Sequence, residues 1–490
     1  MRLDHLGSEL DPDSETPLAL QVARALAQAI QGGELRPGEA LPGTRPLAES
    51  LGASRYAVLG ALQELELEGF LVLRQGSGAY VADRPPAATP GAWGRVPAPV
   101  AGPGSAPAYD LPSQLLPISA LVDAGFDLSE GFPDPRLAPQ EALARAYQRA
   151  VKRHGDQLFG VGEPKGNATL REELARFLRA HRGLVLDPEQ ILVTRGLRNG
   201  LDLALDALLP KGGRLGLEVP GAADLWEGAA LHRGVRLAAL PGDRDGIDPA
   251  VLERELADEP IHALLVRGSP EGGGEVRAAR GQALLVRASA QRFAVLEDDS
   301  AFPFGDGGLA PLPLAAADRA GTTVYLLSFG RLVAPGVRLG LVAGPRALID
   351  RLARIRRSSE LQGDRVLEWA MADLLRDGDL DRYLRRAALA YGKRAERFAA
   401  GLQDRLGAWI EPGERAGLQI WISPRPGFDL GRWAAAARAL GVKLRRPADL
   451  HLPPAAAPRI ALGFATLDDE ELPLLLDLLR KAAEQAQKPS

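Results

Sequence analysis

Apolar residues near the start of the chain recur at helical spacing. Leu18, Val22, Leu26 and Ile30 stand every fourth residue until a Gly-Gly pair ends the pattern, which predicts a helix beginning at Pro17. The elements expected next are a helix from an N-cap at Thr44 to Gly52, a helix after Ser54 up to Gly69, and strands at residues 70–73 and 79–81. Three helices followed by a hairpin predict a winged helix.

From about residue 126, helical patterns alternate with short apolar runs. The strands expected in this region cover residues 190–194, 214–218, 262–266, 294–297, 323–328 and 339–343. Such alternation predicts an α/β domain in which helices cover a mostly parallel sheet. After about residue 370, a long arginine-rich helical stretch precedes two more strand candidates, residues 418–423 and 459–464. That change in pattern predicts a smaller α+β C-terminal subdomain.

The residues between these two regions are rich in proline, alanine and glycine, a composition that favours a semi-extended linker. We therefore expect a multi-domain chain. The predicted parts are a winged helix at residues 1–84, a linker at 85–125, and an α/β domain at 126–490, divided into a large subdomain to about residue 370 and a C-terminal subdomain at 371–490.

Composition removes several classes of chemistry. The chain has no cysteine, which excludes disulfides, thiol catalysis and cysteine-ligated metals, and six scattered histidines give little for a metal site. The first fifteen residues carry five acids in place of the basic region and apolar core of a signal peptide. Because no apolar run reaches membrane-spanning length, we expect a cytoplasmic protein with no membrane partner and no metal.

The spacing of the first region is more specific than its periodicity. PLALQVARALAQAI, followed by GELRPGEALPGTRPLAESLGASRYAVLGALQELELEGFLVLRQGSGAYV, closely resembles the DNA-binding domain of GntR regulators. In a helix-turn-helix, the first residues of the second helix reach the base edges of double-stranded DNA. The resemblance, together with this geometry, implies that the DNA contacts are Arg45, Ser54, Arg55 and Tyr56, with Gly76, Ser77 and Gly78 at the tip of the wing.

The charge of this region is unusual for a DNA-binding module. Residues 17–84 contain six arginines, no lysine and seven acidic residues. Affinity for the phosphate backbone rests largely on positive charge. We therefore expect one module to bind weakly, so that a homodimer on two half-sites is needed.

The segment SFGRLVAPGVRLG, residues 328–340, resembles the cofactor-anchoring segment of fold-type-I pyridoxal-phosphate (PLP) enzymes. In that family the fourth position is the Schiff-base lysine, whereas here it is Arg331. A Schiff base needs a neutral amine, which a guanidinium cannot supply. No lysine occurs between Lys211 and Lys393, so we expect no covalent PLP and no catalytic residue.

Five further motifs stand in the order expected for one family: DLSEGFPDPRLAP, ATLREELARFL, DPEQILVTRGLRNGLDLALDALL, EDDSAFPF and ALGFATLDDEEL. The second region thereby resembles the aminotransferase-like domain of the MocR subfamily, in which a GntR head is fused to a PLP fold of type I. The resemblance implies that Asp298, Ser328 and Arg338 keep the positions for the pyridine nitrogen and the phosphate. Ser300 replaces the tyrosine at the ring hydroxyl, and Ala222 replaces the stacking aromatic.

Three functions remain open at this stage. The leading hypothesis is a PLP-independent transcriptional regulator whose aminotransferase-like domain dimerises and senses a small anionic effector through Arg331, Arg338 and Arg195. The second is a regulator that holds PLP or a related anion non-covalently, through Asp298 and Arg338. The third is an aminotransferase, which Arg331 disfavours. Arg459 resembles the substrate-carboxylate arginine of the family but lies two positions early, so a surface ion pair is the stronger expectation.

Overall fold

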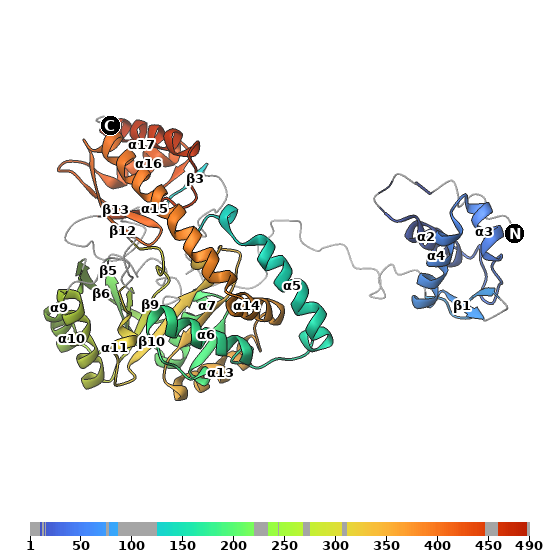
Figure 1. Cartoon of the computed structure of the whole chain (residues 1–490), viewed down its shortest axis with the longest axis horizontal. Coiled ribbons are helices and arrows are strands. Elements are labelled where there is room, and N and C mark those ends of the chain that lie inside the picture. The colour runs from blue at the N-terminus through green and yellow to red at the C-terminus, as the bar shows by residue number, and fades with distance from the viewer. Residues whose placement is uncertain are drawn as a thin grey trace, which may run out of the picture. The chain divides into compact units, whose positions relative to one another are not determined.

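The computed structural model describes residues 10–11, 14, 16–74, 78–86, 125–219, 234–243, 245–267, 275–305, 311–445 and 459–487. Its contacts divide the chain into two compact units, Met1–Leu115 and Leu116–Ser490 (Figure 1). The expected linker falls almost entirely on residues 87–124, which lie outside the described residues. None of the described helices is both long and apolar enough to cross a membrane.

The first unit is a winged helix, as predicted. Its elements are α2 (Leu18–Gln31), α3 (Thr44–Leu51), α4 (Arg55–Leu67), β1 (Leu71–Arg74) and β2 (Gly78–Val81). Val22, Leu26 and Ile30 are buried against the other two helices and the hairpin, so the fourfold spacing of the first helix does mark its core face. One expectation is wrong: Thr44 is the first helical residue and Gly43 takes the N-cap position.

The second unit is built on an eight-stranded sheet. In spatial order its strands are β4 (Ile191–Thr194), β11 (Gly340–Ala343), β10 (Thr323–Ser328), β9 (Ala294–Asp298), β8 (Ala263–Arg267), β5 (Arg214–Val219), β6 (Arg236–Asp243) and β7 (Gly246–Ile247). The strands from β10 to β6 run parallel, while β11 is antiparallel to both of its neighbours. The mostly parallel sheet is confirmed, and β6 is a strand that the apolar pattern did not predict.

Helices cover both faces of this sheet (Figure 1). The covering helices are α5 (Gln140–His154), α6 (Ala168–Arg182), α7 (Leu197–Leu208), α9 (Pro249–Asp258), α10 (Glu275–Gln291), α11 (Leu314–Ala317), α12 (Phe329–Leu332), α13 (Arg346–Ser359) and α14 (Arg365–Arg376), with short 3-10 turns η1 (Pro135–Leu137), η2 (Gly155–Leu158) and η3 (Pro188–Gln190). Side chains alternate between the faces along each strand. Leu326 therefore packs in the cluster that contains α7 and α13 residues, whereas Tyr325 and Leu327 belong to the opposite cluster.

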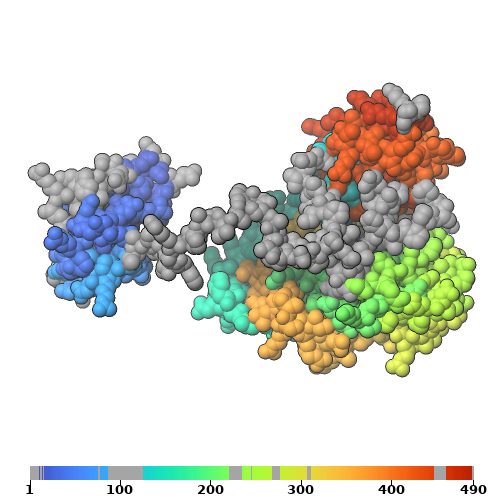
Figure 2. Space-filling model, turned by 180° about the vertical axis from the view of Figure 1, so that it is seen from behind, coloured from blue at the N-terminus to red at the C-terminus, as the bar shows by residue number. Residues whose placement is uncertain are grey.

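The C-terminal subdomain forms a separate lobe, orange and red in Figure 2. Its elements are α15 (Asp379–Leu406), β12 (Ile410–Ala416), β13 (Gln419–Pro424), α16 (Leu430–Ala439), β14 (Val442–Lys443), β15 (Ile460–Gly463) and α17 (Glu471–Gln487). Strands β12, β13 and β15 make an antiparallel sheet, and β3 (Phe126–Asp127) pairs with β14. The α+β pattern was predicted, but β12 was missed.

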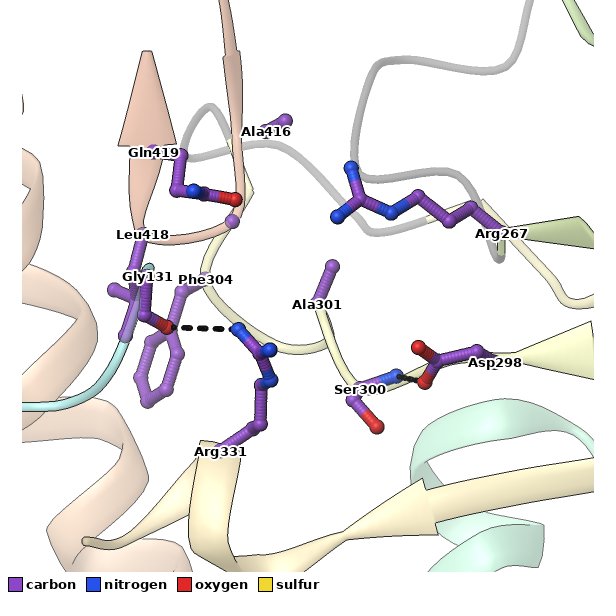
Figure 3. A pocket seen from close by; sticks show the side chains of 11 residues that line it. Gly131, Arg267, Asp298, Ser300, Ala301, Phe304, Arg331, Ala416, Leu418 and Gln419 are labelled. Atoms are coloured by element: carbon purple, nitrogen blue, oxygen red, sulfur yellow. Dashed lines mark hydrogen bonds between the residues drawn. The ribbon is translucent and has the colours of Figure 1, made fainter. Parts of the chain in front are cut away.

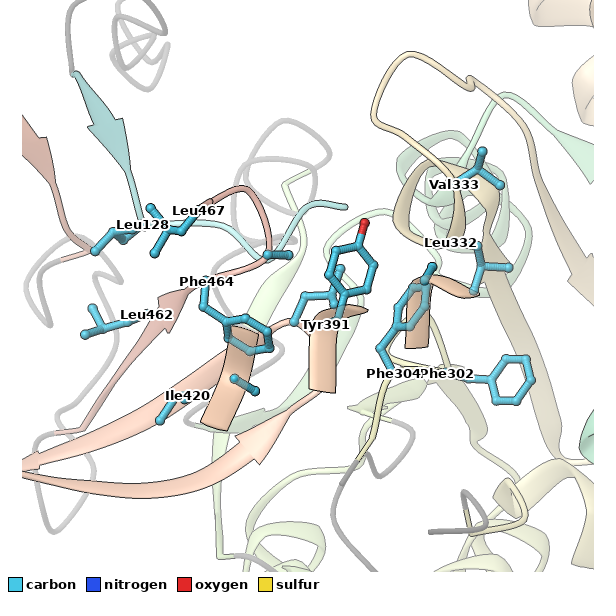
Figure 4. Close-up of a cluster of buried hydrophobic side chains, with 14 of the residues drawn as sticks. Leu128, Phe302, Phe304, Leu332, Val333, Tyr391, Ile420, Leu462, Phe464 and Leu467 are labelled. Carbon is cyan, nitrogen blue, oxygen red and sulfur yellow. The ribbon is translucent and has the colours of Figure 1, made fainter. Parts of the chain in front are cut away.

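A continuous apolar core joins this lobe to the large subdomain (Figure 4). Phe304, which follows β9, meets the ring of Tyr391 on α15 edge to face, with 5.0 Å between the ring centres. Phe464 beyond β15 and Leu332 of α12 are buried in the same core. The loops after β9 and β10 are thereby fixed against the turn between β12 and β13, where the candidate site lies.

Candidate functional site

The recognition helix of the winged helix begins with three exposed polar residues. Ser54 is the N-cap of α4, and its hydroxyl oxygen accepts a hydrogen bond from the backbone N–H of Ala57 at 3.1 Å. Arg55 and Tyr56 follow on the first turn, and the Tyr56 side chain is 89% exposed. Packing does not require an aromatic residue there, whereas a helix entering the major groove presents its first turn to the bases.

Arg45 lies exposed on the first turn of α3. Among the described residues, neither Arg45 nor Arg55 makes an ion pair, so both guanidinium groups are available to phosphates or bases. Of the predicted wing residues, Gly76 and Ser77 lie outside the described residues. Gly78 opens β2 with φ 105°, a conformation that favours glycine.

Arg331 stands at the anchoring position on α12, directly after β10. Its Nη2 lies 3.0 Å from a carboxylate oxygen of Glu130, and its guanidinium carbon lies 4.9 Å from the ring centre of Phe132. Arg445 binds the other carboxylate oxygen of Glu130 at 2.6 Å. The position that would carry a Schiff base is therefore filled by an ion-paired arginine, whose guanidinium also donates a hydrogen bond to the carbonyl oxygen of Gly131 (Figure 3).

The cavity beside Arg331 has a volume of about 40 Å³. Its described lining consists of Gly131, Arg267, Asp298, Ser300, Ala301, Phe304, Arg331, Ala416, Gly417, Leu418 and Gln419. A Schiff base needs an amine at the anchoring position, and the guanidinium of Arg331 is not one. The residue present there therefore does not fit covalently bound PLP.

The acid predicted to face the pyridine nitrogen does line this cavity. Asp298, at the end of β9, accepts a hydrogen bond from the backbone N–H of Ser300 at 3.0 Å. The Ser300 hydroxyl is buried and has no hydrogen-bond partner among the described residues. Ser300, Asp298 and Arg331 are therefore brought together as predicted, but around a small cavity.

A second group of predicted residues lies at the start of α7. Gly196 is the N-cap of this twelve-residue helix and has φ 88°. A Cβ built on Gly196 would lie 3.9 Å from the guanidinium of Arg338 and 4.0 Å from the hydroxyl oxygen of Ser328. Arg338 is exposed and has no partner among the described residues. A helix N-terminus, a hydroxyl and an unpaired guanidinium form a cradle that suits a phosphate.

The remaining predicted cations are already paired. Arg195 binds a carboxylate oxygen of Glu360 at 3.3 Å. Arg459 binds Glu414 at 2.9 Å and lies over the ring of Trp421, which agrees with the expected ion pair. The predicted stacking position, residue 222, lies outside the described residues.

The motif EDDS also places two carboxylates beneath the site. Glu297 is buried and accepts backbone hydrogen bonds from Leu314 and Ala315 at 2.7 and 3.0 Å. Burial, reinforced by the charge of Asp299, raises the pKa of Glu297 to about 7.

Asp299 makes two hydrogen bonds, at 2.6 and 3.0 Å, with the buried guanidinium of Arg182. It accepts a third, from the Tyr325 hydroxyl, at 2.7 Å. Burial raises the pKa of Asp299 in spite of these partners. Glu297 and Asp299 therefore support the loop that carries Ser300.

Sequence reasoning missed three residues of the site. Glu130 stands inside the motif DLSEGFPDPRLAP, but nothing in the sequence marks it as the partner of Arg331, which lies 201 residues away. Arg267 is the last residue of β8 and is followed by the sequence GSPEGGGE, in which no feature marks the arginine as a site residue. Gln419 reaches the site only because the turn from β12 to β13 packs there, and no signal in the sequence marks it.

Comparisons with known proteins divide the chain in the same way. The family "Bacterial regulatory proteins, gntR family" matches residues 18–81, and the family "Aminotransferase class I and II" matches residues 285–479. The pyridoxine biosynthesis transcriptional regulator PdxR of Corynebacterium glutamicum is 30% identical over 437 residues, which cover 88% of this chain and 89% of PdxR. The probable rhizopine catabolism regulatory protein MocR of Rhizobium meliloti is 28% identical over 480 residues, covering 96% and 95% of the two chains.

The chain belongs to the MocR-type GntR transcriptional regulators. As a member of this family it is a DNA-binding transcriptional regulator with an aminotransferase-like domain. An archaeal alanine:glyoxylate aminotransferase shares the fold of that domain, with a TM-score of 0.67 and 22% identity over 73% of this chain and 90% of the enzyme. At this identity the likeness shows the fold alone.

Proposed function

We propose that this MocR-type regulator controls transcription without covalent PLP, and that its aminotransferase-like domain dimerises and senses an effector instead of catalysing transamination. The observation that carries the proposal is the ion pair of Arg331 with Glu130 at the anchoring position. An ion-paired guanidinium neither condenses with an aldehyde nor acts as the proton-transfer base that transamination needs. The names of the relatives, which are those of regulators, support this reading.

The homodimer is supported by an exposed apolar surface on the second unit. Tyr147 and Val151 stand four residues apart on α5, and Phe159 and Val161 follow η2. The Phe159 and Val161 side chains are 83% and 75% exposed. Exposed apolar side chains this close together in the sequence are typical of an interaction surface, and a symmetric pair of chains would bury two copies of it.

The proposal is tested by operator binding in the presence and absence of PLP. We expect the full-length chain, treated with hydroxylamine and dialysed to remove carbonyl compounds, to bind its own promoter duplex with unchanged affinity. Added PLP should not restore or alter binding. An operator affinity that collapses after hydroxylamine treatment and returns with PLP would overturn PLP independence.

A second candidate function is favoured by one observation. Ser328, Arg338 and the start of α7 keep a phosphate cradle although the anchoring lysine is gone. A regulator using this cradle would hold PLP or a related phosphate ester non-covalently. In that case pyridoxine phosphate, which has no aldehyde, should bind as well as PLP, and Arg338→Gln should abolish the binding of both.

A further inference from the structure

Arg267 is a cation at the site whose guanidinium forms no salt bridge within the described part of the chain, although Asp298, Glu218 and Glu130 act on it through their charge. It ends β8, and its guanidinium points into the small cavity beside Arg331 (Figure 3). Among the described residues it makes neither an ion pair nor a side-chain hydrogen bond. Burial, together with the positive charge of Arg331, lowers the pKa of Arg267, although Asp298 opposes this effect. Arg267 is half-buried. Because charges drawn away from water are normally paired, an anion in the cavity would supply the salt bridge that its guanidinium lacks among the described residues.

The neighbouring charges do not supply this partner. Two guanidinium groups, Arg267 and Arg331, and one carboxylate, Asp298, line the cavity. Glu218 accepts a hydrogen bond from the backbone N–H of Arg267 at 3.0 Å, and Glu130 divides its two oxygens between Arg331 and Arg445. The lining therefore has more positive than negative groups, which favours one negative charge inside.

Polar groups that suit an anion surround the same space. Gln419 is 8% exposed, and its side-chain amide is turned toward the cavity (Figure 3). Among the described residues this amide has no hydrogen-bond partner. The Ser300 hydroxyl, also unpartnered, belongs to the same lining. A planar guanidinium donates paired N–H groups that match the two oxygens of a carboxylate, and the nitrogen of an amide can donate one more hydrogen bond.

The volume limits what can enter. A bound water requires about 10 to 15 Å³ measured with a water-sized probe, so the 40 Å³ of this cavity admit a small group such as a carboxylate. The cavity also opens to solvent, so the rest of a larger acid can extend outward. A carboxylate meets the requirements of size, charge and hydrogen bonding together.

We propose that the cavity between Arg267, Arg331 and Gln419 is a receptor for a carboxylate, supplied either as a small free acid or as the head group of a larger organic acid. This inference rests on the proposed sensing role of the aminotransferase-like domain and names the chemistry of the effector. It replaces Arg338 and Arg195 as the predicted anion ligands with Arg267 and Gln419, neither of which makes a side-chain hydrogen bond or an ion pair in the described part of the chain.

The receptor is tested by calorimetric titration of the full-length chain with formate and with succinate, each against sodium chloride at equal ionic strength. We expect both acids to bind and chloride not to compete. Equal affinity for the two would identify a small free acid, whereas tighter binding of succinate would identify a head group. No binding of either acid, or equal binding of chloride, would overturn the proposal.

Two substitutions with opposite expected effects on carboxylate binding, together with one control, sharpen the test. Arg267→Gln should weaken carboxylate binding about 10- to 100-fold, the loss expected for charge-assisted hydrogen bonds. Glu130→Gln removes a competing negative charge and should strengthen binding, which keeps the test decisive if Arg267→Gln fails to fold. Arg198→Gln, at an exposed arginine of α7, should leave binding unchanged, and an equal loss of binding in Arg198→Gln and Arg267→Gln would refute the assignment.

Operator affinity measured in the same samples separates this inference from the proposed function. Carboxylate binding that shifts operator affinity supports both. Carboxylate binding without any shift supports the receptor but contradicts the sensing role. A chain that regulates without PLP yet binds no carboxylate contradicts the receptor alone.

Discussion

Glu297 gives the aminotransferase-like domain a pH dependence that can be calculated from its surroundings. This carboxyl is buried, and its pKa rises from an ordinary 4.5 to about 7 because burial and Asp299 disfavour its charged form. The native state therefore holds a proton between about pH 4.5 and pH 7 that the unfolded state has released. Stability must fall as the pH rises through this window.

The magnitude follows from the shift in pKa. One pKa unit corresponds to about 1.4 kcal/mol. With a shift of about 2.5 units, protonated Glu297 contributes about 3 kcal/mol to the free energy of unfolding at the acid end of the window. Glu297→Gln cannot titrate and removes this contribution at every pH. It also gives up one of two backbone hydrogen bonds, from Leu314 or Ala315, because an amide has only one acceptor oxygen.

That second cost is nearly the same at all pH values, so the comparison between pH values isolates the titration. Between pH 5 and pH 8, we expect wild type to lose about 2 to 3 kcal/mol of unfolding free energy relative to Glu297→Gln. Urea unfolding followed by tryptophan fluorescence reports on this domain, because residues 17–84 contain no tryptophan. Parallel pH profiles for the two proteins would refute the reasoning.

Three further substitutions test other parts of the molecule. Arg55→Ala should cost roughly 1 to 3 kcal/mol of operator binding if Arg55 contacts a base edge. Arg24→Ala, at an exposed arginine of α2, should cost much less. Gel-shift titration measures both losses, and equal losses would contradict the assignment. Asp299→Asn leaves the buried Arg182 guanidinium without a countercharge and should cost about 3 to 5 kcal/mol of unfolding free energy, measurable by urea unfolding; an unchanged midpoint would be the contrary result. Val161→Ser should raise the dimer dissociation constant measured by light scattering. Val185→Ser, at a side chain that is 76% exposed, should leave this constant unchanged. Equal effects of the two substitutions would argue against the apolar surface.

Much of the fold was predictable because its signals are local. The buried run at β10 and the fourfold spacing in α2 depend only on neighbouring residues. Strand β6 was missed because only Ala238 and Leu240 of it are buried and it ends in Pro-Gly-Asp, a sequence typical of a turn. Strand β12 was missed for a similar reason, since only Ile410 and Ala416 at its ends are buried.

The site was predictable only in part. The loss of the anchoring lysine is visible at Arg331 itself, because it is a property of one position. The partner of Arg331 is not, since Glu130 lies 201 residues away and reaches it through the folding of two subdomains. Arg267 and Gln419 meet for the same reason, and neither belongs to a position at which the family resemblance assigned a role.

The most direct test of a regulator that works without covalent PLP is to measure whether PLP attaches to the chain. The purified full-length chain would be mixed with one equivalent of PLP, reduced with borohydride, and analysed by intact mass and peptide mapping. We expect no aldimine absorbance band and no stoichiometric pyridoxyl adduct, because Arg331 is ion-paired with Glu130 and offers no amine. A stoichiometric adduct on Lys165, Lys211, Lys393 or Lys443, appearing together with an aldimine band, would contradict a regulator that works without covalent PLP.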